Sequence, residues 1–214
     1  MQKYLVKNNL SNPTIRALLT ALLLITLPLN AYASLIIQEV LYDGDGSDSD
    51  DAFTELFGTP GMDLVGWQLI GINGRNGDIY RSLNLSGAVV PADGILLIAT
   101  ADANLLVATQ RDWIANVDWQ NGPDAIQLWN PLGDIIDALQ YGDATLFNAG
   151  NGNPTADISA GWSLNRTANN GDNLSDFSAQ QIPTPGAMAN TIPEPSSVLL
   201  VGAALIVMRI RRNG

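Results

Sequence analysis

The sequence predicts an all-β fold, a sandwich of two sheets, in one domain over residues 34–190. Three observations predict it. Apolar and β-branched runs of about four to eight residues recur between turn signals. Only one weak stretch, residues 101–108, shows helical periodicity. Asn-Gly pairs, which accept the positive φ angles of tight hairpin turns, punctuate the runs at 73–74, 76–77, 121–122 and 170–171.

The runs define the expected strands in chain order. We place strands at Leu35–Tyr42, Phe53–Phe57, Trp67–Ile72, Asp78–Leu83, Gly94–Ala99, Ala125–Trp129 and Ile135–Tyr141. The chain has five tryptophans, and Trp67, Trp129 and Trp162 stand in or beside such runs. We expect them in a core between two sheets. A row of exposed tryptophans that bind sugar rings by stacking is the alternative.

The N-terminal segment has the parts of a secretory signal peptide. Three basic residues precede an apolar run at 17–29, which ends in Ala31-Tyr32-Ala33. The small side chains of Ala31 and Ala33 fit the pocket of signal peptidase. We therefore expect residues 1–33 to be a signal peptide that is cut after Ala33. An uncleaved anchor is the alternative, and the short apolar run disfavours it.

The C-terminal segment, residues 191–214, has three parts in a fixed order. A Pro-Glu-Pro motif at Pro193, Glu194 and Pro195 precedes an apolar helix over about 196–210, and basic residues follow within 209–212. This order closely resembles a PEP-CTERM sorting tail. The resemblance implies recognition by an exosortase, a membrane cysteine protease, in species that make exopolysaccharide. An ordinary membrane anchor behind a Pro-containing linker is the alternative.

Composition limits the chemistry of the domain. The chain lacks both Cys and His, which removes thiolate nucleophiles, disulfides and the commonest general base and metal ligand. Within residues 34–190, four arginines stand against twenty acids, a net charge of −16. Such a field repels nucleic acid, so we expect no nucleic-acid partner. Chemistry based on oxygen ligands and carboxylates remains open.

The ordered motifs of the domain resemble a bacterial lamin-tail domain. They cover nearly all of residues 35–189 and lie at Ile36–Asp43, Phe53–Leu56, Asp63–Leu69, Asp78–Gly87, Asn121–Leu128, Ile135–Gly142, Ser163–Arg166 and Pro183–Gly186. Gln38 stands where that family usually has Asn. The resemblance implies an immunoglobulin-like β-sandwich. It also implies a binding or adhesion module without its own chemistry, and it does not identify the ligand.

An acidic loop is the candidate metal site. It contains Asp43, Asp45, Asp48, Asp50 and Asp51 within nine residues. Calcium takes six to eight oxygen ligands and suits a flexible loop of Gly, Ser and Asp. The spacing departs from an EF-hand, because Asp48 stands where that loop needs Gly. We expect a solvated loop and no cofactor, with calcium as the alternative.

Glu39 and Glu55 form the candidate catalytic pair. They lie on neighbouring predicted strands, and two carboxylates can perform acid/base work in glycosidases. They could equally be edge charges or partners of Arg81 or Arg166. The chain shows no signal of a deep pocket, so a hydrolase is the less favoured alternative.

The sequence thus predicts a non-enzymatic, exported binding or adhesion module of the cell envelope or extracellular matrix. Its expected partners are signal peptidase, an exosortase-like protease, and exopolysaccharide or an envelope protein. A calcium-dependent adhesin, a hydrolase using Glu39 and Glu55, and an acidic matrix filler without a defined ligand are the alternatives.

Overall fold

A computed structural model describes residues 35–188 of the chain. The predicted signal peptide with Ala31 and Ala33, and the sorting tail with Pro193, Glu194 and Pro195, lie outside the described residues. Within residues 35–188, no helix has the length and apolar character needed to cross a bilayer.

All seven predicted strands are present, with ends within two residues of the expected ones. They are β1 (Ile36–Leu41), β2 (Phe53–Phe57), β3 (Gln68–Asn73), β4 (Ile79–Asn84), β5 (Ile95–Ala99), β7 (Asp124–Trp129) and β8 (Ile135–Tyr141). The weak helical stretch is real but begins later, as α3 (Leu105–Gln110). The Asn104 side chain accepts a hydrogen bond from the Val107 N–H and caps α3, which explains where this helix begins.

Three strands were not predicted. They are β6 (Trp113–Ile114), β9 (Ser163–Arg166) and β10 (Phe177–Gln180). They are short, and none of them contains more than two consecutive apolar residues, so they show no apolar run. Two four-residue helices, α2 (Asp48–Asp51) and α4 (Asn173–Asp176), complete the structure.

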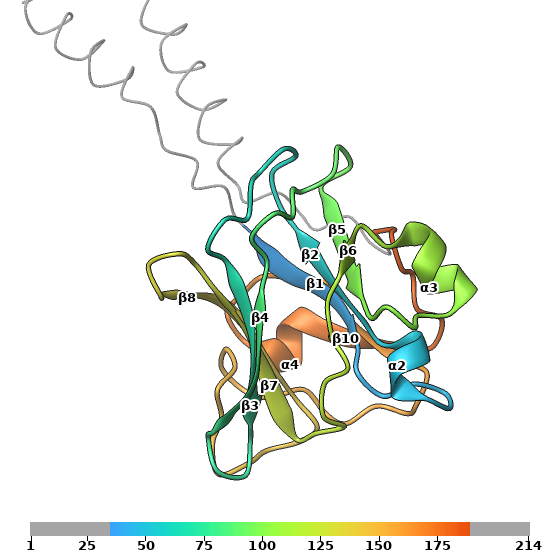
Figure 1. The fold of residues 1–214 in the computed structure, drawn as a ribbon. Helices are drawn as coiled ribbons and strands as arrows, with labels where there is room; N and C mark the ends of the chain where they lie inside the picture. Colours follow the sequence, from blue (N-terminus) through green and yellow to red (C-terminus); the bar gives the residue numbers. More distant parts are fainter. Residues whose placement is uncertain (1–34, 189–214) are drawn as a thin grey trace, which may run out of the picture. The chain divides into compact units, whose positions relative to one another are not determined.

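The strands form two sheets (Figure 1). The larger sheet has the order β10-β9-β1-β2-β5-β6, and the smaller sheet has the order β4-β3-β7-β8. Neighbouring strands are antiparallel except for β5 and β6. The all-β prediction with two sheets is therefore confirmed.

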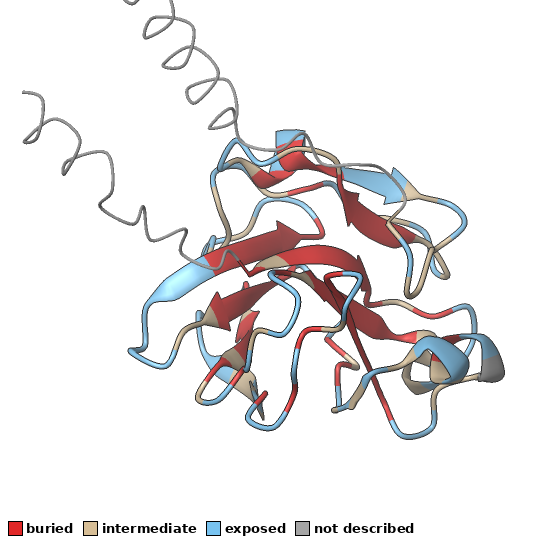
Figure 2. Cartoon of the chain, turned by 90° about the horizontal axis from the view of Figure 1, so that it is seen from above, coloured by how far each residue is buried: buried red, intermediate tan, exposed pale blue. Residues whose placement is uncertain are grey.

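The main core contains residues from both sheets. Leu56 and Leu96 of the larger sheet belong to one buried cluster with Leu69 and Leu128 of the smaller one. Strand alternation explains this in β2, where Leu56 enters the core while its neighbour Glu55 points to the opposite face. Figure 2 shows the buried residues concentrated along the strands and the exposed ones in connecting loops.

The tryptophan prediction is confirmed in part. Trp67 and Trp119 are buried in the main core, and Trp119 Nε1 donates to Thr54 Oγ1 over 2.9 Å. Trp113 is partly buried against the same core. Trp129 instead packs against a separate cluster of Ile70, Ile72 and Ala125, and Trp162 is half-buried outside the main core.

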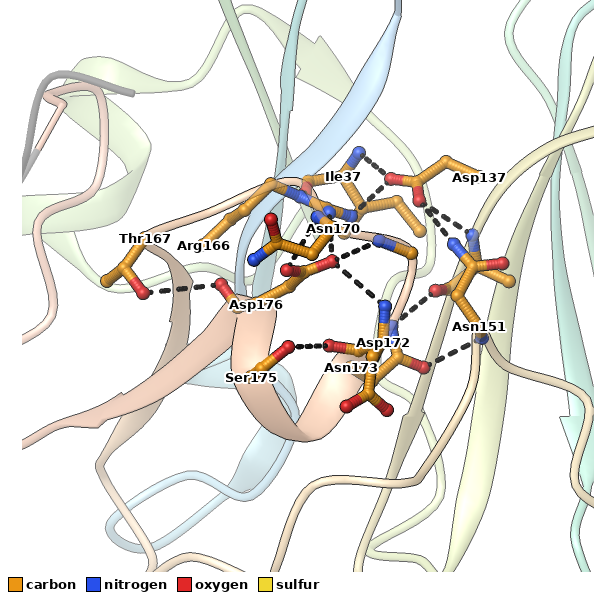
Figure 3. A network of polar contacts seen from close by, with 12 residues as sticks. Ile37, Asp137, Asn151, Arg166, Thr167, Asn170, Asp172, Asn173, Ser175 and Asp176 are labelled. Carbon is orange, nitrogen blue, oxygen red and sulfur yellow. Dashed lines mark hydrogen bonds and ion pairs between the residues drawn. The ribbon is translucent and has the colours of Figure 1, made fainter. Parts of the chain in front are cut away.

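A buried arginine joins the two sheets. Arg166 on β9 has no exposed surface, and its Nε donates to the Ile37 carbonyl over 2.8 Å. Its Nη2 pairs with Asp137 Oδ2 at 2.6 Å, and Asp137 belongs to β8 of the other sheet. Asp137 Oδ2 also accepts the Ile37 N–H at 2.8 Å. We call these three residues the Arg166 clasp (Figure 3).

The loop around α4 surrounds this clasp. The Asp176 carboxylate lies 3.9 Å from Arg166 Nη1 and accepts the backbone N–H groups of Asn170, Gly171 and Asp172. The Phe177 ring lies 4.4 Å from the guanidinium carbon, a cation–π contact. Asp137 and Asp176 thus place negative charge beside the buried guanidinium, while Nη1 has no hydrogen-bond partner among residues 35–188.

Candidate functional site

Glu39 and Glu55 lie side by side in the middle of the larger sheet. They are directly opposite each other in the register of β1 and β2, and neither has exposed surface. Their interpretation as edge charges is wrong, because β9 and β5 flank the pair on either side. Their pairing with arginine is also wrong. Arg166 pairs with Asp137, and Arg81 donates to the Asn116 carbonyl at 2.7 Å.

Residues 181–188, which we call the C-terminal strap, contribute backbone and side-chain donors to the pair. The N–H and the hydroxyl of Thr184 donate to the two oxygens of Glu39, at 3.0 and 2.7 Å. The Gly186 N–H donates to Glu55 Oε1. Below the strap, Ser163 Oγ donates to Glu39 Oε1 at 2.6 Å. The carboxylates are therefore enclosed between sheet and strap.

The two glutamates have different environments. Glu39 accepts several hydrogen bonds, whereas Glu55 Oε2 is buried without a partner among the described residues. Burial, with the charge of Glu39 as a second cause, raises the pKa of Glu55 to about 9. Glu55 thus holds a proton at neutral pH. A carboxyl group with a raised pKa beside a second carboxylate is the electrostatic arrangement of a glycosidase, but here the strap covers both groups and neither is exposed.

The acidic loop uses part of its charge to hold its own backbone. The Gly44 N–H donates to Asp48 Oδ1 at 3.0 Å, and the Asp45 N–H donates to Asp51 Oδ2 at 3.2 Å. Asp43 Oδ1 accepts from Asn121 Nδ2 at 3.1 Å. Burial, with Asp48 and Asp157 nearby, raises the pKa of Asp43. Asp50 is exposed.

The predicted calcium ligands do not gather around one point. Between residues 35 and 188, no three acidic side chains are arranged to share a metal ion. Asp48 and Asp51 each accept a backbone N–H of the loop itself. A calcium site here stays a prediction that requires the loop to rearrange.

A groove that the sequence analysis did not predict lies beside the smaller sheet. Three segments line it, residues 73–75 in the turn between β3 and β4, residues 120–124 before and at the start of β7, and residues 144–146 after β8. Its volume is about 710 Å³. It is open to solvent and carries polar side chains together with the exposed Leu146.

The walls of the groove are fixed by close packing. The Gly74 N–H donates to Asp124 Oδ1 at 2.8 Å, and a Cβ atom at Gly74 would lie 2.2 Å from the Pro123 carbonyl oxygen. Only glycine allows this approach. Gln120 is held by two tyrosines, because its N–H donates to Tyr80 Oη at 3.3 Å and its carbonyl accepts from Tyr141 Oη at 2.7 Å.

One signal in the sequence pointed to this groove. Two of the four Asn-Gly pairs, at 73–74 and 121–122, lie in its walls, but an Asn-Gly pair by itself indicates only a turn. The contact between these turns joins segments about 50 residues apart, as the bond from Gly74 to Asp124 does. Such a contact depends on the pairing of β3 with β7, which local patterns do not reveal.

Neither the family models, nor the curated proteins, nor the solved structures with which the chain was compared match it.

Proposed function

We propose that this chain is a non-enzymatic binding module that is exported and sorted to the cell envelope or extracellular matrix. The observation that carries the proposal is the groove, an open concavity of about 710 Å³ with polar walls. Its volume is in the range of about 300–1,000 Å³ that small-ligand sites occupy. Loops held on a rigid sheet are a common place for binding residues.

The enclosed glutamates support a role without catalysis. A general acid must come within hydrogen-bond reach of its substrate, and both carboxylates are fully buried under donors from Thr184 and Gly186. The hydrolase alternative needs the strap to leave the sheet. The two sheets, antiparallel apart from the pair β5 and β6, also agree with the immunoglobulin-like type, which we propose for the sandwich together with its lamin-tail resemblance.

Export and sorting are the second half of the proposal. The charge pattern of residues 1–33 and the Pro193-Glu194-Pro195 motif support them. The test is fractionation of cells that express the full chain with the motif intact or replaced by three alanines. We expect the intact chain to be shortened and released, and the variant to stay in the membrane fraction at higher mass. If both versions reach the same fraction at the same mass, the tail is only an anchor.

Binding is tested with the exported protein recovered from those cells. It is applied to arrays of glycans and of envelope proteins. Saturable retention on either array supports the binding module. Absence of retention on both arrays would favour the acidic matrix filler.

A further inference from the structure

We propose that the groove at residues 73–75, 120–124 and 144–146 binds a segment of a neutral saccharide. This inference rests on the proposed binding function and names its ligand class. The groove presents side-chain amides of Asn73, Gln120 and Asn121 on one open surface. An amide both donates and accepts hydrogen bonds, as a sugar hydroxyl does, so amides and hydroxyls can pair in either direction.

Much of this hydrogen-bonding capacity is unused by the protein. Asn73 Nδ2 donates to Gln120 Oε1 at 3.1 Å, and Asn121 Nδ2 donates to Asp43 Oδ1 at 3.1 Å. Among residues 35–188, no hydrogen bond engages Gln120 Nε2 or Asn121 Oδ1. Both side chains are exposed, so a ligand hydroxyl can reach these groups.

The charges in the groove favour an uncharged ligand. Arg75 is the one basic residue in its lining, and Asp124 is the one acid. Asp124 is 4% exposed and already accepts the Gly74 N–H. The surrounding domain carries a net charge of −16, which repels polyanions such as nucleic acid or acidic polysaccharide. The buried position of Asp124 leaves little negative charge for a cationic peptide.

An apolar edge completes the match to a sugar, which has C–H faces as well as hydroxyls. Leu146 in the lining is 87% exposed. Its neighbour Phe147 is 46% exposed, and its N–H donates to the Gly74 carbonyl at 3.1 Å. The Phe147 ring lies against Gly77, outside the lining of the groove, where a Cβ atom would lie 2.9 Å from its Cδ1. An exposed aromatic ring offers a flat surface on which a sugar ring can stack.

The rigidity of the walls lowers the entropic cost of binding. Gln120 is fixed through its backbone by Tyr80 and Tyr141, and Gly74 is packed against Pro123. Groups that are already ordered lose little freedom when a ligand arrives. The backbone that carries the Gln120 side chain is therefore ordered before a ligand binds.

The test measures retention of the full exported protein on immobilised neutral glycans, namely glucans, mannans, galactans and chitin oligosaccharides, with polygalacturonate as an acidic probe. The double variant Gln120→Ala/Asn121→Ala is compared with a matched variant outside the groove, Asn169→Ala/Gln181→Ala. We expect about a tenfold loss of affinity for the neutral glycan in the first variant, since each lost hydrogen bond is worth about 0.5–1.5 kcal/mol. The matched variant is expected to bind as the unaltered protein does.

Two further measurements separate a loss of binding from unfolding and from charge effects. Melting temperatures show that both variants are folded, and retention on the neutral glycan is expected to be unchanged between low and high salt. Neutral-glycan binding that the groove variant does not weaken would overturn the assignment of the site. Retention on polygalacturonate or on envelope proteins alone would overturn the ligand class while leaving the binding module intact. Retention on none of these surfaces would count against both.

Discussion

Replacing Glu55 with glutamine is expected to stabilise the domain at neutral and alkaline pH. Glu55 is fully buried, and its pKa is raised to about 9 because burial, and secondly the charge of Glu39, penalise its ionised form. Glutamine has the same shape and never ionises. In the unaltered protein, the folded state must keep a proton on Glu55 that the unfolded chain releases. The glutamine variant has no such proton, so this pH-dependent loss of stability disappears.

The sign and the size of the effect follow from the two pKa values. Below the unfolded value of 4.5, both states hold the proton and Glu55 adds no pH dependence. Between 4.5 and about 9 only the folded state holds it, so the free energy of unfolding falls as the pH rises. At about 1.4 kcal/mol per pKa unit, the loss between pH 5 and pH 8 is on the order of 3–4 kcal/mol. Above pH 9 both states release the proton, so the free energy of unfolding no longer falls because of Glu55.

The assay is urea unfolding of the full chain from pH 5 to pH 9, followed by tryptophan fluorescence. We expect the Glu55→Gln variant to lose less stability than the unaltered protein over this range. The comparison of the two proteins cancels the general repulsion among the remaining acids. If both proteins lose stability equally with pH, the assignment of a protonated Glu55 is wrong.

Glu39→Gln is the matched control. The Glu39 carboxylate accepts from Ser163 and twice from Thr184, and a glutamine there would turn its NH₂ group toward one of these donors. We expect a loss of about 1–3 kcal/mol at every pH. The pH dependence from Glu55 is expected to persist, because burial is its first cause.

Three further predictions concern the clasp, the groove and the acidic loop. Arg166→Met leaves the buried Asp137 without its cation and is expected to cost about 3–5 kcal/mol in urea unfolding; a cost under 1 kcal/mol would contradict the role of the clasp. Gly74→Ala places a methyl group 2.2 Å from the Pro123 carbonyl oxygen, so we expect a lower melting temperature and weaker glycan retention, and unchanged values would show that the walls are not rigid. The melting temperature is expected to be the same in millimolar calcium and in chelator, because Asp48 and Asp51 already accept backbone N–H groups; a clear rise with calcium would support the calcium-dependent adhesin.

The strands could be predicted from sequence where burial on both faces produces apolar runs. β5, Ile95–Ala99, is buried at every position and was found to within one residue. β9 has the sequence Ser-Leu-Asn-Arg and is equally buried, yet it contains one apolar residue. Its polar side chains are satisfied by Glu39, Gln38 and Asp137 from other strands. Local patterns cannot reveal such a strand, because its partners lie more than 25 residues away.

The same reason explains what was missed at the candidate sites. The adjacency of Glu39 and Glu55 could be predicted, since the two strands follow each other in the chain. Their enclosure could not, because it depends on Thr184, 145 residues after Glu39. At Asp137 the sequence carries a partial signal of the buried ion pair. This residue is a lone charge in the otherwise apolar start of β8, and such a residue needs a cation or donors when buried, but the sequence does not say which arginine supplies it.

The Arg166 clasp also affects the order in which the domain can form. The bond from Arg166 to the Ile37 carbonyl joins residues 129 positions apart, so β1 lacks one of its neighbours until nearly the whole domain is available. Contacts over such distances close slowly. A chain that is made from its N-terminus therefore presents β1 long before β9 is available to pair with it. The larger sheet can be completed only when the segment up to Gln180 has been made.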